Sequence, residues 1–200
     1  MHIYIVDDDR DIQASLGLTL RRAGHEVQSF GRAGAFLSVE ADLTPGCVML
    51  DLCLPDSDGL AVQSELAQLG TRHVIILLSG FGDVPDAVHA MRAGALDFLK
   101  KPFRRAELFD ALDRAQGALD ARRAEQAETQ RGTLLETLST RERDVLMASA
   151  DGDGAKQVAF TLDLSVRTVE MHRANILKKL KVPNFGAALL LAQGAGMFRG

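Results

Sequence analysis

The segment Cys47-Val48-Met49-Leu50-Asp51 is a short apolar run that ends in an aspartate. Continuous apolar runs of about four to eight residues are typical of strands that are buried on both faces of a parallel sheet. Similar runs occur on both sides of this one along the chain, at His2–Val6, Glu26–Phe30, Val74–Leu78 and Asp97–Leu99. Together with Cys47–Leu50, these runs predict a five-stranded sheet.

Amphipathic segments of helical length separate the runs. They lie at about Asp11–Ala23, Ala33–Val39, Leu60–Leu69 and Val84–Ala93, and another helix begins at Arg104. Strands that alternate with helices are typical of a parallel sheet covered on both faces, with its binding groups at the carboxyl ends of the strands. Residues 1–118 are therefore predicted to form a doubly wound α/β domain, whose functional residues follow the strands.

Complementary polar groups follow four of the predicted strands. Asp7 and Asp8 follow the first, Asp51 the third, Ser79 the fourth and Lys101 the fifth. Carboxylates that converge repel one another by about 4 kcal/mol per pair at ~4 Å and an effective dielectric near 20, so a cation must lie among them. Oxygen ligands suit a hard divalent ion such as Mg²⁺, and the lysine adds a second positive charge. Such a set could hold a phosphoryl group.

Each of these residues also has a purely structural interpretation. An aspartate after a strand is often a helix N-cap, and we expect this of Asp9 or Asp11 in the first helix and of Asp58 in the third. The pair Lys100–Lys101, taken alone, is typical of solvated surface. The functional interpretation depends on four strand ends carrying complementary groups at once.

Four segments of this part of the chain form a recognisable pattern. They are Val6-Asp7-Asp8-Asp9, Leu50-Asp51-Leu52-Cys53-Leu54-Pro55-Asp56-Ser57-Asp58-Gly59, Leu78-Ser79-Gly80 and Asp97-Phe98-Leu99-Lys100-Lys101-Pro102-Phe103. Together they closely resemble the receiver domain of bacterial response regulators, and the resemblance covers about the first 118 residues. It implies that a sensor histidine kinase transfers a phosphoryl group to Asp51.

The resemblance also implies roles for the neighbouring residues. Asp7, Asp8 and Asp51, with the backbone carbonyl of Cys53, would hold Mg²⁺. Lys101 would pair with the phosphoryl group, while Ser79 and Phe98 would be the hydroxyl and aromatic positions of the switch. Phe98 lacks the hydroxyl of the tyrosine that is common in the family, so any rotamer switch there would depend on packing alone.

The rest of the chain differs in charge and in pattern. The formal charge is −6 over residues 1–118, −1 over 119–136 and +3 over 137–200. Residues 104–131 are predicted to form one long helix whose apolar line stops at Leu119, so residues 119–136 are interpreted as a helical linker. A basic domain behind an acidic one suggests a polyanionic partner.

Residues 137–200 are predicted to form an all-α domain. Ser139 and Glu142 have the spacing of a capping box at the start of a helix, and a turn signal follows at 151–154. Three further helices are expected at Lys156–Leu162, Val166–Lys181 and Phe185–Ala195. A short helix, a tight turn and a longer basic helix are the helix-turn-helix arrangement.

The helix Val166–Lys181 has two distinct faces on a helical wheel. Val169, Ile176, Leu177 and Leu180 form the apolar face, and the opposite face carries Arg167, Met171, Ala174, Asn175 and Lys178, with Glu170 at its margin. Such a face could enter the major groove of DNA or could simply be solvated.

Three segments of this domain look like a LuxR-type DNA-binding domain. They are Leu138-Ser139-Thr140-Arg141-Glu142, residues 159–176 and Lys179-Leu180. The order of the two modules is that of the FixJ/NarL response regulators. This resemblance implies base contacts from Glu170, Met171 and Ala174. It implies contacts to phosphates from Arg167, Thr168, Lys178 and Lys179.

Composition excludes several other classes of protein. No apolar run approaches the roughly 18 residues of a membrane span, and three aspartates interrupt the N-terminus before a signal sequence could form. Cys47 and Cys53 alone cannot make a disulfide framework. We therefore expect a cytoplasmic protein with no membrane partner.

The leading interpretation is a transcription regulator that is not an enzyme, binds double-stranded DNA and forms a homodimer when phosphorylated. The dimer would form through the face around Val88, Met91 and Arg92. One alternative is an Asp-based phosphatase, which would need an acid at the position of Cys53. A second alternative is a receiver that never meets phosphate and binds DNA constitutively.

Overall fold

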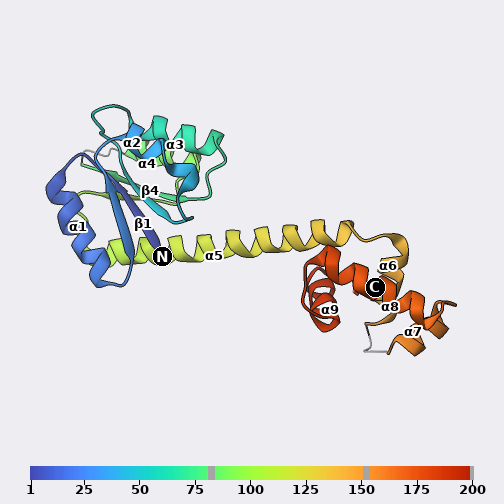
Figure 1. Cartoon of the computed structure of the whole chain (residues 1–200). Helices are drawn as coiled ribbons and strands as arrows, with labels where there is room; N and C mark the ends of the chain where they lie inside the picture. The colour runs from blue at the N-terminus through green and yellow to red at the C-terminus, as the bar shows by residue number, and fades with distance from the viewer. Residues whose placement is uncertain (81–83, 151–153, 199–200) are drawn as a thin grey trace. The chain divides into compact units, whose positions relative to one another are not determined.

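The computed structural model describes residues 1–80, 84–150 and 154–198, so residues 151–153 of the predicted turn lie outside the description. The chain divides into two compact units, Met1–Arg122 and Arg123–Gly200. Helix α5, Arg105–Glu136, belongs to both of them and includes all of the linker expected at residues 119–136 (Figure 1). The functional limits at residues 118 and 136 stay predictions.

The N-terminal unit contains a five-stranded parallel sheet, as predicted. The strands are β1 (His2–Val6), β2 (Glu26–Phe30), β3 (Cys47–Asp51), β4 (Val74–Ser79) and β5 (Asp97–Lys100), in the order β2-β1-β3-β4-β5. Every residue of the central strand β3 is buried. Because all strands run in the same direction, their carboxyl ends, including those of β1, β3, β4 and β5, meet at one edge.

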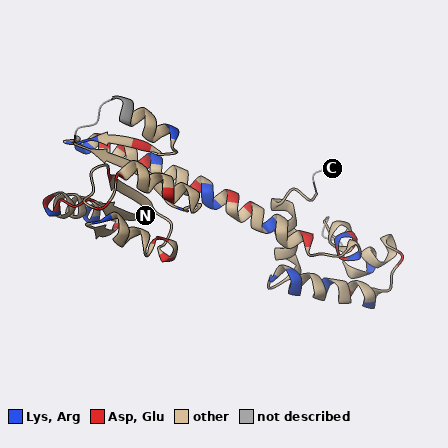
Figure 2. Cartoon of the chain, turned by 90° about the horizontal axis from the view of Figure 1, so that it is seen from above, with Lys and Arg blue, Asp and Glu red and all other residues tan. Residues whose placement is uncertain are grey.

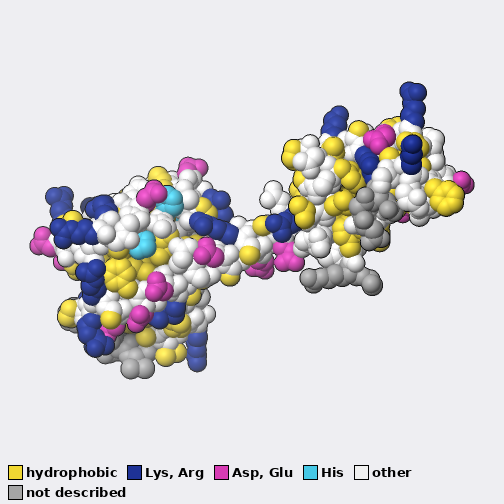
Figure 3. Space-filling model, turned by 90° about the horizontal axis from the view of Figure 1, so that it is seen from below, with side chains coloured by type: hydrophobic (Ala, Val, Ile, Leu, Met, Phe, Trp, Pro, Cys, Tyr) yellow, Lys and Arg dark blue, Asp and Glu magenta, His cyan; other side chains and the backbone are white. Residues whose placement is uncertain are grey.

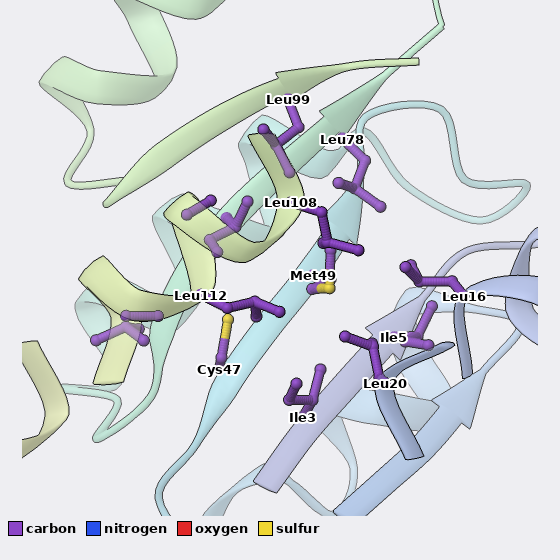
Figure 4. Close-up of a cluster of buried hydrophobic side chains, with 14 of the residues drawn as sticks. Ile3, Ile5, Leu16, Leu20, Cys47, Met49, Leu78, Leu99, Leu108 and Leu112 are labelled. Atoms are coloured by element: carbon purple, nitrogen blue, oxygen red, sulfur yellow. The ribbon is translucent and has the colours of Figure 1, made fainter. Parts of the chain in front are cut away.

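Helices cover both faces of this sheet. They are α1 (Arg10–Arg22), α2 (Ala33–Leu37), α3 (Gly59–Gln68), α4 (Val84–Arg92) and the first part of α5. One face packs against α1 and α5, where Leu16 and Leu112 meet Ile5 and Met49 (Figure 4). The other face packs against α2, α3 and α4 (Figure 1). The predicted α/β class is therefore confirmed.

Capping side chains show why two of these helices begin where they do. Asp9 caps α1 by accepting hydrogen bonds from the N–H groups of Asp11 and Ile12, and Asp58 caps α3 through Leu60. A carboxylate at an N-terminus satisfies donors that have no partner within the helix. The second helix is shorter than expected, because a separate 3₁₀ turn, η1 (Glu40–Asp42), follows it.

The C-terminal unit packs four helices around one core, to which Leu134 and Leu135 at the end of α5 also belong. The four helices are α6 (Thr140–Ala148), α7 (Ala155–Thr161), α8 (Val166–Leu180) and α9 (Phe185–Gly194). The capping box predicted for α6 is present, since Ser139 and Glu142 each bond the backbone N–H of the other. The apolar face expected for the helix that is now α8 is also confirmed, because Val169, Ile176 and Leu180 are buried in one core.

Across the described ranges 1–80, 84–150 and 154–198, every helix is too short or too polar to span a lipid bilayer.

A buried polar cluster lies at the amino ends of the strands. His73 is 2% exposed; its Nδ1 accepts the Gly46 N–H at 3.1 Å, and its Nε2 lies 3.4 Å from the carbonyl oxygen of Glu40. This arrangement assigns the proton of the neutral ring to Nε2. Burial lowers the pKa of His73 in spite of the nearby Glu40 carboxylate. The carbonyl of His73 accepts a hydrogen bond of 2.7 Å from Arg122, which ties α5 to the start of β4.

We predict that acid destabilises the N-terminal unit through His73. The unfolded histidine takes up a proton near its ordinary pKa of 6.5, whereas the folded one does so only at lower pH. The unfolded state therefore binds more protons below about pH 6.5, and stability falls as the pH falls through that range. His73→Gln keeps an acceptor for Gly46 but removes the titration, so its stability should depend less on pH.

Thermal unfolding followed by circular dichroism between about pH 8 and 5 measures this difference. The control is His89→Gln, which removes an exposed histidine of α4 and should behave like the wild type. Equal acid sensitivity of the wild type and His73→Gln would assign the effect to other groups.

Candidate functional site

Three carboxylates converge at the carboxyl ends of β1 and β3. One oxygen each from Asp7, Asp8 and Asp51 lies within 4.8 Å of the others. Asp7 is 1% exposed and Asp51 is 6% exposed, whereas Asp8 is open to solvent. The sheet order puts β1 next to β3, so residues 44 positions apart in the sequence become neighbours.

A single ammonium group joins the two buried carboxylates. Lys101 Nζ lies 2.6 Å from Asp7 Oδ2 and 2.7 Å from Asp51 Oδ1. Lys101 follows β5, so its side chain reaches past the end of β4 to meet β3. Its backbone N–H donates to the carbonyl oxygen of Ser79 at 2.7 Å, and this bond fixes the backbone position from which the lysine side chain extends.

The proximity of these groups shifts two pKa values. Burial raises the pKa of Asp51, as does the Asp7 carboxylate, while Lys101 acts in the opposite direction. Burial alone would lower the pKa of Lys101, but its hydrogen bonds to Asp51 and Asp7 outweigh burial and raise it. Lys101 therefore stays a cation at neutral pH, and it offsets part of the repulsion between the carboxylates.

Backbone groups hold both acids in place. The Asp9 N–H donates to Asp7 Oδ1 at 3.0 Å, and the Cys53 N–H donates to Asp51 Oδ2 at 3.2 Å. The side-chain amide of Gln13 donates to the backbone carbonyl of Asp7, which steadies the end of β1. Sequence analysis missed Gln13, because nothing in the pattern of α1 distinguishes it from an ordinary exposed position.

The two predicted switch residues lie on neighbouring strands. Ser79 ends β4 and is 4% exposed. Phe98 lies on β5 and is partly buried against the core on the side of α2, α3 and α4. The structure therefore brings Ser79 to the same edge as the acidic cluster and sets Phe98 beside that edge, within the packing of the sheet.

The outward face of α8 carries most of the residues expected to contact DNA. Arg167, Glu170, Met171, Ala174 and Lys178 are exposed. Thr168 is half-buried, and its N–H bonds the capping hydroxyl of Ser165 at 3.0 Å. Basic positions outnumber acidic ones on this unit (Figure 2), as expected from its charge. Apolar side chains also reach its surface (Figure 3), among them Met171 and the 84% exposed Phe160.

Lys179 has a structural partner that sequence analysis did not foresee. Its Nζ lies 2.6 Å from Oε2 of Glu142, whose side chain is 5% exposed. Glu142 also accepts the Ser139 N–H at 2.7 Å, so one carboxylate joins the cap of α6 to α8. Arg173 makes a second link, since it donates to Ser149 at 3.1 Å and stacks 4.6 Å above the Phe185 ring. These links determine which face of α8 points outward.

Comparison with known proteins identifies both units. The family model of the response regulator receiver domain matches residues 3–113. The model of bacterial regulatory proteins of the luxR family matches residues 136–192. The chain belongs to the FixJ/NarL family of two-component response regulators. It is a phosphorylation-activated transcriptional response regulator.

Relatives extend along nearly the whole chain. The response regulator protein TmoT of Ectopseudomonas mendocina is 43% identical over 182 residues, which are 90% of this chain and 82% of that protein. The transcriptional regulatory protein FixJ of Rhizobium meliloti is 38% identical over 195 residues, 97% of this chain and 96% of FixJ.

Solved structures of response regulators are also similar to this FixJ/NarL family member over nearly its whole length. The response regulator StyR has a TM-score of 0.71 and 34% identity, covering 96% of this chain and 98% of its own. Full-length FixJ of B. japonicum has a TM-score of 0.59 and 36% identity, covering 98% and 97%. A receiver domain implies a histidine kinase as partner, and a LuxR-type domain implies binding to DNA.

Proposed function

We propose that Asp51 is the residue that accepts the phosphoryl group from a sensor histidine kinase. The observation that carries this proposal is the Lys101 ammonium 2.7 Å from Asp51 and 2.6 Å from Asp7. Asp51 ends the central strand and offers a carboxylate at the edge of the sheet. A positive charge fixed beside a carboxylate is what the transfer of an anionic group to that carboxylate requires.

The reaction replaces the P–N bond of a phosphohistidine with a P–O bond to Asp51. An oxygen of Asp51 attacks the phosphorus of a phosphohistidine, the P–N bond breaks, and the histidine nitrogen leaves with the bonding pair. The product is an acyl phosphate on Asp51. The Lys101 ammonium lies where it can offset the charge of the transferred oxygens, and the Cys53 N–H orients the carboxylate.

The acidic cluster fits a hard divalent cation. Asp7, Asp8 and Asp51 offer only oxygen atoms, which Mg²⁺ prefers. In this proposal they hold Mg²⁺ together with the carbonyl of Cys53. A bound Mg²⁺ would neutralise charge on the phosphoryl oxygens. Lys101, Ser79 and Phe98 respond to phosphorylation in this proposal. The Lys101 ammonium and the Ser79 hydroxyl bind the phosphoryl group, and the Phe98 ring changes its packing.

The phosphatase alternative has weaker support. Such an enzyme needs an acid two residues after the nucleophile, and this chain has Cys53 there. It also leaves the LuxR-type match at residues 136–192 without a purpose. We therefore propose a regulator without an enzymatic activity towards other substrates, with a receiver at 1–118, a linker at 119–136 and a DNA-binding domain at 137–200.

We predict that acetyl phosphate with Mg²⁺, or a partner kinase, adds one phosphoryl group to the wild-type chain and none to Asp51→Asn. The amide of asparagine is a much weaker nucleophile than a carboxylate. Intact-mass spectrometry reads the added group directly. Asp11→Asn removes an exposed carboxylate near the same edge and should be phosphorylated normally. Normal uptake by Asp51→Asn would assign the acceptor elsewhere.

We further propose that phosphorylation produces a homodimer through the outer face of α4. Val88 is 43% exposed and Met91 is 48% exposed, and Arg92 lies beside them. Apolar side chains exposed next to a charged one are typical of a surface that a partner covers. Twofold symmetry is the commonest form of assembly, and it matches paired half-sites in DNA.

We predict that Met91→Asp blocks this dimer, because a carboxylate buried in an apolar interface loses its hydration. Sedimentation velocity before and after phosphorylation measures the change. Leu18→Asp is the matched control, since Leu18 is 51% exposed on α1, on the other side of the sheet. If the wild type stays monomeric and still binds DNA more tightly, activation proceeds by release of the DNA-binding unit.

For DNA, we propose that Glu170, Met171 and Ala174 contact bases. Arg167, Thr168, Lys178 and Lys179 would contact phosphates. Support comes from the exposure of the first three residues on one face of α8. Lys178 is the better test of phosphate contacts, because Lys179 is engaged with Glu142 and its loss would also disturb the fold.

We predict that Lys178→Ala weakens binding to all sequences alike and flattens the salt dependence by about one unit of slope. Met171→Ala should instead change the preferred operator, by roughly 1–3 kcal/mol per affected base pair. Binding to a randomised operator library at two salt concentrations distinguishes the two effects. A change of base preference in Lys178→Ala but not in Met171→Ala would show that another face of α8 meets the bases.

A further inference from the structure

Asp56 lies in the loop between β3 and α3, a short distance along the chain after Asp51, and it bonds a different helix, α2. Its Oδ1 accepts the Ala33 N–H and its Oδ2 accepts the Gly34 N–H, both at 3.0 Å. These are the first two residues of α2. The carboxylate therefore joins the loop after Asp51 to a helix that is 22 residues earlier in the sequence.

Helix α2 depends on this carboxylate for its cap. The residue at its own N-cap position, Arg32, makes no side-chain capping hydrogen bond. The N–H groups of Gly34 and Ala33 stabilise the ionised carboxyl of Asp56 and hold its pKa below its usual range.

The loop is held at its other points by the sheet and by α3. The Cys53 N–H bonds Asp51, and Cys53 forms an isolated bridge with Asp58, the residue that caps α3. Leu54 is buried in the core on the same side. The Asp56 carboxylate adds two hydrogen bonds to α2, whose Ala33 and Phe36 share that core with Leu54.

The partner of Asp56 is itself firmly anchored. Ala33 is 1% exposed and Phe36 is 0% exposed, and both belong to the core that contains Leu54. A helix fixed in this way offers a rigid support for the loop. The carbonyl of Cys53, which the proposed metal site uses, lies in the stretch between the anchor at Asp51 and the anchor at Asp56.

We propose that Asp56 is a positioning residue for phosphoryl transfer: it ties the loop that carries the Cys53 carbonyl to α2 and so keeps that oxygen in register with the carboxylates of Asp7 and Asp51. This inference rests on the proposed function of the acidic cluster. Asp56 does not touch the reacting atoms. Its effect is on where the loop holds the Cys53 carbonyl, and hence on the affinity for Mg²⁺.

The primary measurement is Mg²⁺ binding to the full chain by isothermal titration calorimetry. We expect Asp56→Ala to raise the dissociation constant at least threefold. Asp56→Asn keeps one acceptor oxygen and should give a smaller increase. Phosphorylation of Asp56→Ala by acetyl phosphate should be slower than that of the wild type at low Mg²⁺ and should reach the wild-type rate at saturating Mg²⁺. Asp42→Asn removes an exposed carboxylate in η1 and should leave the affinity unchanged.

A double variant distinguishes positioning of the loop from simple support of α2. Arg32 has the extended backbone of an N-cap residue, so Arg32→Asp can give α2 a cap of its own. In the Asp56→Ala background this change should restore the melting temperature but leave Mg²⁺ affinity low, because the loop still lacks its hydrogen bonds to α2. Arg32→Asp alone corrects for the added charge.

Recovery of both melting temperature and Mg²⁺ affinity in the double variant would overturn the positioning role, as would an unchanged affinity in Asp56→Ala and Asp56→Asn. A wild-type chain that gains no phosphoryl group at Asp51 is a different result. It would refute the proposed function, and with it this inference.

Discussion

One ammonium group between two buried carboxylates holds the functional edge of the sheet together. Asp7 and Asp51 are almost fully buried at the carboxyl ends of adjacent strands, and without a cation their repulsion would force one of them to take up a proton or the two to move apart. Lys101 supplies that cation from beyond β5. Its backbone also bonds Ser79 at the end of β4. Four strand ends are therefore linked through a single residue, and a change in charge at Asp51 acts on all of them.

The C-terminal unit uses a buried charge for another purpose. The buried Glu142 carboxylate joins the start of α6 to Lys179 on α8. Arg173 reaches from α8 to Ser149 and Phe185. A recognition helix must be held in one rotation for its outward residues to be defined. In this unit the apolar core and these polar links together fix that rotation.

Sequence alone predicted much of this structure, for reasons that are visible at particular residues. Strand ends could be found because apolar runs such as Cys47–Leu50 stop at a polar residue, and caps because Ser139 and Glu142 have a fixed spacing. Contacts between distant segments left no such signal. The bond from Asp56 to α2 and the pairing of Lys179 with Glu142 depend on which elements become neighbours, and local patterns do not contain that information.

The extent of α5 shows the same limit. Its apolar line ends at Leu119, after which charged residues of both signs alternate along the helix (Figure 2). The helix nevertheless continues to Glu136, beyond the expected end at residue 131. Leu135 is 8% exposed in the C-terminal core, so packing at that end stabilises turns that the linker sequence would not maintain alone.

The arrangement around α4 determines how a signal at Asp51 could leave the site. An acyl phosphate adds negative charge and acceptor oxygens, while Lys101 is already shared with Asp7. Further donors must come from neighbouring strand ends, and Ser79 is the nearest hydroxyl in the sheet order. At the far end of α4, Gln63 on α3 donates to the carbonyl of Ala90 at 2.9 Å in a fully buried contact. This bond joins α4, which follows β4 and Ser79 in the chain, to α3, which follows β3 and Asp51, so the helices that come after these two strand ends are coupled through a buried contact.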